Sequence, residues 1–520
     1  MLRREFLTLA AAAVAVARQD RAPSLITRDE DRPAVPCGVA TGDVTDGRVI
    51  VWSRSDRPAR LIVEYSTTAS FADTRRVVAL AALEDTDFTA RVDLTGLPAG
   101  QRISYRVRFQ DLADLRRFSV PVEGTFQTPG GAVASGRVAD RDVSFTFSGD
   151  CVGQGWGIDP SRGGMRLYDA MRKLQPDVFI HLGDTIYADQ PLTPEVVLDD
   201  GSIWRNVVTE AKSRAAQTLD DYRGCHRYNL QDEHMRRFNA EVSQIALWDD
   251  HEVLDNWYPT ERLDADPRAG VKSVALLAAR AKRAFLEYLP LRVSPIEGER
   301  IYRAWRQGPA LEIFALDMRS YRGPNSTNRQ PALTEESAML GAAQLLWLEQ
   351  ALAASTSTWK VIASDMPLGV VVPDAGGAFD AVANRENGAP LGRELEIARL
   401  LKFIKDRRIR NVVWLTADVH YCAAHHYSPE RARFTAFDPF WEFVAGPLHA
   451  GSFGPNELDR TFGPEVRFLG IPPGMKPNRP PSEPFQFFGS GRVDRRTQAL
   501  TMKLHNINGE IFSLELPAVR

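Results

Sequence analysis

Residues 179–187 read Phe-Ile-His-Leu-Gly-Asp-Thr-Ile-Tyr, a short apolar run that ends in an acidic residue and a tyrosine. Four further apolar runs end in the same way, and they lead to Asp150-Cys151, Asp249-Asp250-His251-Glu252, Ser364-Asp365 and Asp418-Val419-His420. In α/β folds, ligands bind at the carboxyl ends of the strands. We therefore expect these five strand ends to meet in one crevice.

The chain after residue 140 alternates between strand-like and helix-like segments. The predicted strands are 143–147, 177–182, 242–248, 311–316, 360–363 and 411–415. The predicted helices are 165–174, 205–238, 271–288, 343–353 and 394–406. This alternation predicts an α/β catalytic domain over residues 140–520, with helices on the faces of the sheet.

The segment from residue 35 to residue 130 has a different texture. Short alternating segments, such as 47–53, 59–65 and 104–109, are separated by turn formers such as Asp46-Gly47. Regularly spaced short strands predict a small β-sandwich domain, and the Leu-Pro-Ala-Gly turn at 97–100 is similar to fibronectin-III-like modules. Small residues at 130–136 predict a linker between the two domains.

The first 34 residues are predicted to be an export signal and leader. Arg3-Arg4 precedes an Ala-rich apolar run, 7–17, which is well short of the roughly 20 residues that cross a bilayer as a helix. The arginine pair predicts export by the twin-arginine route, so the twin-arginine machinery is an expected partner. The exported protein is expected to be secreted or periplasmic. We expect no transmembrane helix in the mature protein. A soluble N-terminal helix is the alternative interpretation.

Composition narrows the class of protein. The 520 residues are 44% hydrophobic and 25% charged, which is ordinary for a globular enzyme and excludes wholesale disorder. Lys and Arg number 64 against 67 Asp and Glu, so no specific nucleic-acid-binding surface is expected. The four cysteines are too few for a disulfide scaffold, and the disulfide state of Cys37 and Cys225 stays open.

Several carboxylates in one crevice repel one another unless cations neutralise them. Asp, Tyr, Cys and His side chains together therefore indicate bound metal. Phenolate, thiolate and imidazole favour a transition metal, whereas carboxylates favour a hard divalent ion. Each residue alone has a structural alternative: a helix cap for Asp184, a buried thiol for Cys151, and core packing for Tyr187 and His251.

Taken together, the blocks 183–187, 249–252 and 418–420 resemble those of calcineurin-like metallophosphatases. They are more similar to the alkaline phosphatase D (PhoD-type) branch, which also carries a twin-arginine signal and a small β-sandwich. Residues 316–322, Leu-Asp-Met-Arg-Ser-Tyr-Arg, resemble that branch's segment between the blocks. The resemblance covers nearly the whole chain. It implies a metallophosphatase-type four-layer αββα sandwich preceded by a small all-β domain.

The resemblance also implies a binuclear or multinuclear site for Fe³⁺ and Ca²⁺. The implied ferric ligands are Asp184, as the bridging carboxylate, with Tyr187, Cys151 and His420. The implied ligands of the second metal are Asp150, Asp250 and Asp418. Asp184 and His251 are the implied catalytic residues, with His251 donating a hydrogen bond or proton to the phosphoryl oxygen or the leaving group.

This chain departs from the family's pattern at one position, where Asp365 stands in place of a histidine ligand. Asp365 is expected to serve as an oxygen ligand; otherwise the second site lacks that contact. Arg319 is expected either to bind phosphate or to form a structural salt bridge. His425 and His426, just after the last block, are assigned to packing or to contacts outside the metal ligands.

The expected function is a secreted phosphoesterase that hydrolyses small-molecule or polymeric phosphate esters through a metal-bound hydroxide at a two-metal site. The first alternative is a phospholipase D-like or teichoic-acid-type phosphodiesterase on the same scaffold. The second is a surface-binding protein whose metal site is vestigial.

Overall fold

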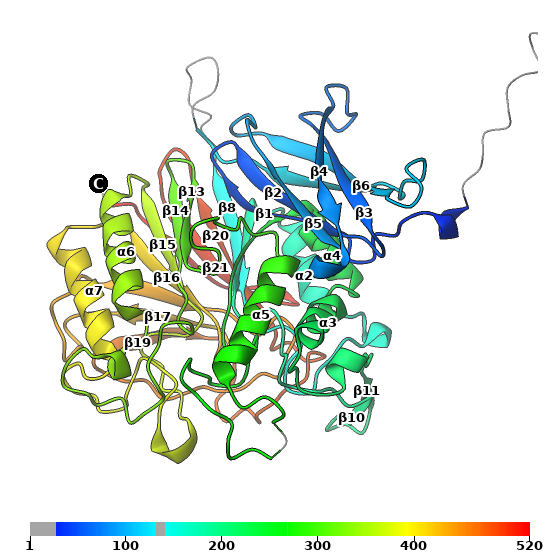
Figure 1. Cartoon of the computed structure of the whole chain (residues 1–520). Coiled ribbons are helices and arrows are strands. Elements are labelled where there is room, and N and C mark those ends of the chain that lie inside the picture. Colours follow the sequence, from blue (N-terminus) through cyan, green and yellow to red (C-terminus); the bar gives the residue numbers. More distant parts are fainter. Residues whose placement is uncertain (1–27, 132–140, 268, 520) are drawn as a thin grey trace, which may run out of the picture.

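The protein is described by a computed structural model over residues 28–131, 141–267 and 269–519 (Figure 1). Most of the predicted leader and most of the predicted linker lie outside these residues. Within the described ranges, none of the helices has the length and apolarity needed to cross a membrane.

Two large sheets and one smaller sheet form the body of the molecule. The nine-stranded sheet has the order β22 (Gly509–Leu516), β21 (Leu500–Asn506), β20 (Phe487–Val493), β8 (Val143–Ser148), β9 (Val178–Leu182), β12 (Ser243–Leu247), β1 (Val39–Thr45), β2 (Arg48–Arg54) and β5 (Thr89–Leu94). The seven-stranded sheet has the order β13 (Arg303–Gln307), β14 (Leu311–Ala315), β15 (Trp359–Ala363), β16 (Val412–Thr416), β18 (Phe440–Val444), β17 (Ala423–Tyr427) and β19 (Pro464–Leu469). The four-stranded sheet has the order β4 (Arg75–Ala82), β3 (Ala59–Ser66), β6 (Arg102–Asp111) and β7 (Val122–Gln127), and β10 (Glu195–Val197) pairs with β11 (Ile203–Arg205).

Helices complete the architecture. The α-helices are α2 (Arg166–Lys173), α3 (Leu219–Asn229), α4 (Glu233–Glu241), α5 (Val274–Tyr288), α6 (Gly341–Ala354) and α7 (Glu394–Asp406). Short 3-10 turns lie at η1 (Asp29–Asp31), η2 (Glu84–Thr86), η3 (Pro160–Arg162), η4 (Glu210–Lys212), η5 (Glu335–Ser337) and η6 (Ala375–Gly377). The sequence at the start of α3 explains why the helix begins there. Thr218 and Asp221 form a reciprocal capping box that satisfies backbone N–H groups at the helix N-terminus.

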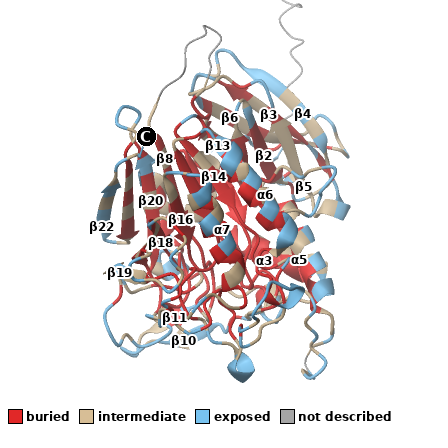
Figure 2. Ribbon diagram, turned by 90° about the vertical axis from the view of Figure 1, so that its left-hand side faces the viewer, coloured by how far each residue is buried: buried red, intermediate tan, exposed pale blue. Residues whose placement is uncertain are grey.

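The core explains the layered arrangement. Apolar side chains of both large sheets, such as Ile180 and Val361, belong to one continuous buried cluster (Figure 2). On the outer side of the seven-stranded sheet, Leu348 of α6 and Leu401 of α7 belong to the same cluster as Trp414. On the other outer side, α2 and α4 pack together over β9. Helix, sheet, sheet and helix are therefore the four layers, which confirms the predicted αββα fold class.

The N-terminal region is all-β, as predicted, but it shares a sheet with the α/β part. Strand β1 pairs in parallel with β12 at Gly42 and Gln244, so β1, β2 and β5 extend the nine-stranded sheet. Strands β3, β4, β6 and β7 form the second layer of this region. A Cβ atom on Gly42 would lie 2.6 Å from the carbonyl oxygen of Pro290, so only glycine permits this close approach.

Candidate metal centre

The site residues follow the carboxyl ends of parallel strands from both large sheets. β8, β9 and β12 are parallel neighbours in one sheet, and β14, β15 and β16 are parallel neighbours in the other. The residues that follow them are Asp150 after β8, Asp184 after β9, Asp249-Asp250-His251 after β12, Arg319 after β14, Asp365 after β15, and Asp418 and His420 after β16. The two sheets therefore deliver polar groups to the same end of the sandwich.

Three overlapping groups of ligand atoms meet there. Within each group the atoms lie within 4.8 Å of one another, and the groups are Asp150 with Asp184 and His420, Asp184 with Asp250 and His251, and Asp249 with Asp250 and Asp418. Asp184 and Asp250 each belong to two groups, so they connect the three into one cluster. The structure thus brings together most of the residues that the sequence assigned to a metal site, and their roles as ligands stay predictions.

The turns that carry these groups have unusual backbone angles. Asp150, Asp184, Asp418 and His420 have φ values of 64°, 50°, 64° and 60°, in the left-handed region that non-glycine residues rarely adopt. Such residues persist only where surrounding contacts hold them, and they concentrate at functional sites. Here the N–H of Cys151 donates to the carbonyl oxygen of Asp184 at 2.9 Å, which ties two of the turns together.

Glu252 fixes the ends of β9 and β12 to each other. Its buried carboxylate accepts hydrogen bonds from the backbone N–H groups of Asp184 at 3.1 Å and Asp249 at 2.8 Å. It also accepts one from the Thr185 hydroxyl at 2.6 Å. A single buried carboxylate therefore sets the spacing of two predicted ligand turns.

His251 is held by a carboxylate and an aromatic ring. Its Nδ1 lies 2.9 Å and 3.0 Å from the two carboxylate oxygens of Asp189, and its ring stacks on Tyr187 with centroids 4.3 Å apart. Burial by itself would lower the pKa of His251, but the charges of Asp189, Asp250 and Asp184 raise it well above its ordinary value. Asp189 therefore holds the ring at Nδ1, and Nε2 lies 3.6 Å from the exposed carboxylate of Asp255.

His420 has the opposite electrostatic state. Its Nδ1 donates to the carbonyl oxygen of Gly451, and its Nε2 lies 2.8 Å from the Tyr187 hydroxyl and 3.9 Å from Asp150 Oδ1. Burial lowers the pKa of His420 to about 4, so the ring is neutral. A neutral imidazole with Nδ1 bonded to a carbonyl presents the Nε2 lone pair that metal ions bind.

The donor set fits bound cations. Within the described residues, neither carboxylate oxygen of Asp150 has a hydrogen-bond donor, and Asp249 Oδ2 has none either. Burial raises the pKa of Asp150 to about 8, and burial together with neighbouring carboxylates raises the pKa of Asp184 and Asp418 well above the ordinary value. Buried carboxylates that lack donors are stabilised when cations supply the missing positive charge.

Arg319 lies inside this cluster. Its side chain is fully buried, and its Nε donates to Asp249 Oδ1 at 2.7 Å while its Nη1 donates to Asp380 Oδ1 at 2.9 Å. This is the structural salt bridge that the sequence left open as the alternative to phosphate binding. The arginine faces carboxylates of the protein, with none of its side-chain surface open to a substrate.

Two predicted ligands have other partners. The Cys151 thiol contacts Met165 Sδ at 3.6 Å and the Tyr168 hydroxyl at 3.7 Å within an apolar cluster, and burial raises its pKa to about 12. Cys151 therefore lies outside the three groups of ligand atoms found among the described residues, and its role as a ferric ligand stays a prediction. Asp365 accepts from the backbone N–H of Met366 and lies 3.5 Å from Arg319 Nε. Its Oδ2 has no hydrogen-bond partner within the described residues, and its role as a metal ligand stays a prediction.

The structure also adds residues that the sequence reasoning passed over. They are Asp189, which holds His251; Asp249, a member of the carboxylate cluster; Glu252, which joins two turns; and Asp380, which binds Arg319. The first three lie inside or within two residues of the quoted blocks, so they could have been weighed from the sequence. Asp380 does not directly follow a strand, so the strand-end pattern in the sequence could not indicate it.

The remaining histidines and cysteines have structural surroundings. His425 Nδ1 lies 3.0 Å from Glu442, and His426 packs against Trp441. Cys37 and Cys225 are buried free thiols, as are the other two cysteines.

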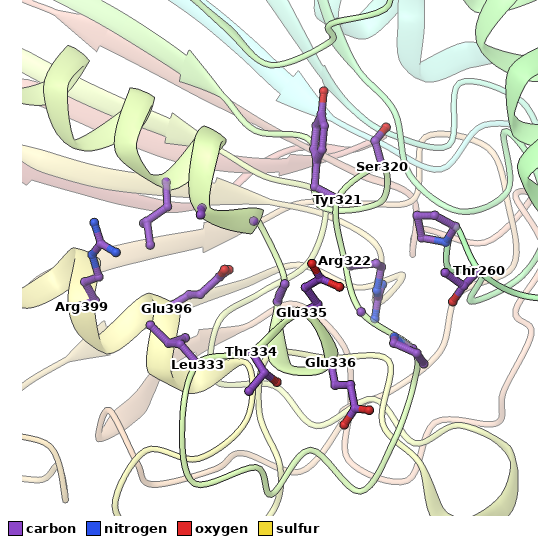
Figure 3. Close-up of a pocket in the computed structure, with 17 residues that line it drawn as sticks. Thr260, Ser320, Tyr321, Arg322, Leu333, Thr334, Glu335, Glu336, Glu396 and Arg399 are labelled. Carbon is purple, nitrogen blue, oxygen red and sulfur yellow. The ribbon is translucent and has the colours of Figure 1, made fainter.

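A pocket of about 710 Å³ is lined by residues that follow Arg319 in the chain and by residues of α6 and α7 (Figure 3). Its lining includes Ser320 and Tyr321, which directly follow Arg319, together with Glu335 and with Glu396 of α7. Glu396 already accepts from the backbone N–H groups that begin α6. In the described part of the chain, the pocket's lining includes none of the clustered strand-end carboxylates.

Comparison with known proteins identifies the relatives of this fold and site. The family model for PhoD-like phosphatase matches residues 145–504, and the model for the PhoD-like phosphatase N-terminal domain matches residues 19–129. Alkaline phosphatase D of Bacillus subtilis (strain 168) is 30% identical over 313 residues, which cover 56% of this chain and 50% of that protein. The match thus spans about half the length of this curated relative.

Two solved structures share the architecture. A structure of PhoD superposes with a TM-score of 0.67 at 21% identity, covering 96% of this chain and 94% of that chain. The purple acid phosphatase PPD1 from yellow lupin (Lupinus luteus) superposes with a TM-score of 0.55 at 11% identity, covering 94% of this chain and 74% of that chain.

The four-layer fold, with polar strand ends gathered at one edge, defines a protein of the metallophosphatase class. Within that class, the chain belongs to the PhoD-like phosphatase family, as the family model's match to most of the chain shows. The resemblance drawn from the sequence blocks is confirmed.

Proposed function

We propose that this protein is a metal-dependent phosphoesterase that hydrolyses phosphate esters. The observation that carries the proposal is the meeting of Asp150, Asp184, Asp250, His251 and His420 in overlapping groups of ligand atoms, in a chain of the PhoD-like phosphatase family. Carboxylates at this density call for cations, and phosphate esters are anions that cations bind and activate. The family match supports the same reaction class.

Two kinds of cation suit the two ends of the cluster. Asp150, Asp184 and His420, with the Tyr187 hydroxyl 2.8 Å from His420 Nε2, offer the mixed oxygen and nitrogen donors that suit Fe³⁺. The all-carboxylate group of Asp249, Asp250 and Asp418 suits Ca²⁺. When bound, such cations supply Lewis-acid activation of the ester and of the attacking water.

The protein's own residues handle the proton on the leaving group. As the P–O bond breaks, the departing alcohol oxygen gains negative charge, and a donor at hydrogen-bond distance lowers the barrier. When protonated, His251 presents Nε2 for this transfer, because Asp189 occupies Nδ1 and the Tyr187 ring stacks on the imidazole. His251 is thus the proposed proton donor, and Asp189 is its positioning residue.

The decisive assay compares two esters. Purified protein should hydrolyse 4-nitrophenyl phosphate or bis(4-nitrophenyl) phosphate, and elemental analysis should find bound metal. Asp184→Asn should abolish hydrolysis of both esters and release metal. The surface variant Asp199→Asn should retain hydrolysis of both esters and the bound metal. Preference for the bis-ester would favour the phospholipase D-like or teichoic-acid-type diesterase. A metal-free protein inactive on both esters would contradict the proposal and favour a surface-binding protein.

The metal assignment has its own readout. A tyrosinate bound to ferric iron colours a protein, so an absorption band in the visible range that disappears in Tyr187→Phe supports iron at the Asp150 end. A colourless protein with a full complement of other metals would overturn the iron assignment and leave the hydrolase proposal intact.

We also propose export by the twin-arginine route, supported by Arg3-Arg4 and the apolar run that follows. Residues 1–34 fused to a reporter should direct it out of the bacterial cytoplasm. Replacement of both arginines by lysine should retain the reporter inside, and unchanged export by that variant would refute the assignment.

A further inference from the structure

Arg319 is a fully buried charge at the centre of the carboxylate cluster. It follows β14, whereas the carboxylates around it follow β12, β15 and β16, so four strand ends contribute to one ionic group. An uncompensated buried charge is costly, so a buried arginine needs anions or other hydrogen-bond acceptors around it. The position of Arg319 therefore bears on the charge balance of the cluster as much as the positions of the carboxylates do.

The guanidinium is shared among several anions. Nε donates to Asp249 at 2.7 Å and lies 3.5 Å from Asp365 Oδ2. Nη2 lies 3.9 Å from both Asp250 Oδ2 and Asp418 Oδ1, and within the described residues it has no hydrogen-bond acceptor. Asp249, Asp250 and Asp418 are the three residues of the all-carboxylate group. The free edge of the guanidinium thus faces a candidate cation site.

Contacts on the side of Arg319 away from its Nη2 atom fix the orientation of the side chain. Asp380 accepts Nη1 at 2.9 Å, and Asp317 accepts the Arg319 backbone N–H at 3.2 Å. Asp380 is itself held by Arg322, whose Nη2 lies 2.9 Å from Asp380 Oδ1. With its far side anchored, the arginine cannot move away when a cation approaches its Nη2 edge.

We propose that Arg319 is a resident cation of this cluster, one that neutralises Asp249, Asp250 and Asp418 in the metal-free protein and shares them with the bound divalent ion. This inference rests on the proposed cation site and does not depend on the reaction, because it concerns metal binding and folding alone. Arg319 stabilises the empty cluster and weakens divalent binding, since two cations then share the same carboxylates.

The test measures Ca²⁺ binding by calorimetry and thermal unfolding on chelator-treated full-length protein. Arg319→Gln should unfold at lower temperature without metal, yet bind Ca²⁺ with a Kd lower by at least about tenfold, because a unit charge close to a divalent ion is removed. Arg319→Lys retains the charge and should stay closer to the parent protein in both measurements. An Arg319→Gln protein that binds Ca²⁺ no more tightly than the parent would overturn the proposal.

A matched control separates charge from packing. Arg393 is also buried, but it donates to the backbone carbonyls of Phe379 and Asp380 and to Asn325. Arg393→Gln should lower the unfolding temperature and leave the Ca²⁺ Kd unchanged. If Arg319→Gln fails to fold, Asp380→Asn decides: with its rear anion gone, Arg319 should draw more on the other carboxylates and weaken Ca²⁺ binding. An unchanged Kd in Asp380→Asn would refute the shared-cation account.

Discussion

Asp189→Asn is the sharpest test of how the site handles protons. The substitution retains the shape of the side chain but removes the charge that binds His251 Nδ1 at 2.9 Å and 3.0 Å, with both side chains less than a tenth exposed. A buried hydrogen bond to a charged group contributes about 1.5–3 kcal/mol. Because that stabilisation favours the protonated imidazole, the pKa of His251 should fall in the variant.

The sign of the pH effect follows from that shift. His251 donates only while protonated, and its raised pKa preserves the donor until the pH rises through that value. In Asp189→Asn the basic limb of the rate profile should therefore move to lower pH. General acid catalysis is worth about 10²–10⁴-fold in rate, so at alkaline pH the variant should lose about 10–100-fold.

The assay compares kcat/KM for two esters whose leaving groups differ in basicity. Phenyl phosphate needs a proton donor far more than 4-nitrophenyl phosphate does, so the loss in kcat/KM should be about tenfold greater for the phenyl ester. Asp199→Asn is the control, because this exposed carboxylate pairs with Lys476 and Arg479 and should matter little to either ester. Equal losses for both esters, or an unmoved pH profile, would refute the role of Asp189 and His251 as positioning residue and donor.

Three further outcomes test the surroundings of the site. Gly446→Ala should lower stability by about 1–3 kcal/mol and deplete bound metal, because its Cβ would lie 1.9 Å from Asp150 Oδ2; thermal unfolding and elemental analysis check this. Asp221→Asn should cost about 1 kcal/mol at neutral pH in urea denaturation. Burial opposes ionisation of Asp221, but N–H donors from Thr218 and Gln217 lower its pKa, so its contribution is complete above the unfolded value of about 3.9 and disappears as the pH falls through the folded one. Chelation should lower the unfolding temperature, and added Ca²⁺ should restore it.

The sequence predicted the location of the site well because its signal is local. A buried strand such as Val178–Leu182 is a short apolar run, and the polar residue after it is adjacent in the chain. Once parallel strands are assumed, their ends must meet. Asp150, Asp184, Asp250 and Asp418 could therefore be found without knowing strand order.

Features that depend on distant pairing could not be found in this way. The parallel contact of β1 with β12 joins residues about 200 positions apart, and local alternation looks the same in a separate sandwich and in an extension of a larger sheet. The stretch 205–238, predicted to be mostly helical, holds α3 and most of α4. The first of these helices begins only at the capping box of Thr218, after a loop.

Cys151 and Asp365 are two predicted ligands that lie outside the three groups of ligand atoms. They show that residue type alone does not determine what a side chain contacts. Cys151 follows Asp150 directly, but in this turn, where Asp150 has a left-handed φ, the carboxylate faces the site and the thiol faces Met165. Asp365 ends a strand like the other carboxylates, and its Oδ2, which has no hydrogen-bond partner within the described residues, lies 3.5 Å from Arg319 of the neighbouring strand end. Whether an aspartate at such an edge binds a metal ion or a guanidinium depends on which cation the adjacent strand supplies. In this chain the adjacent strand end supplies Arg319, whose Nε donates to Asp249 and lies 3.5 Å from Asp365.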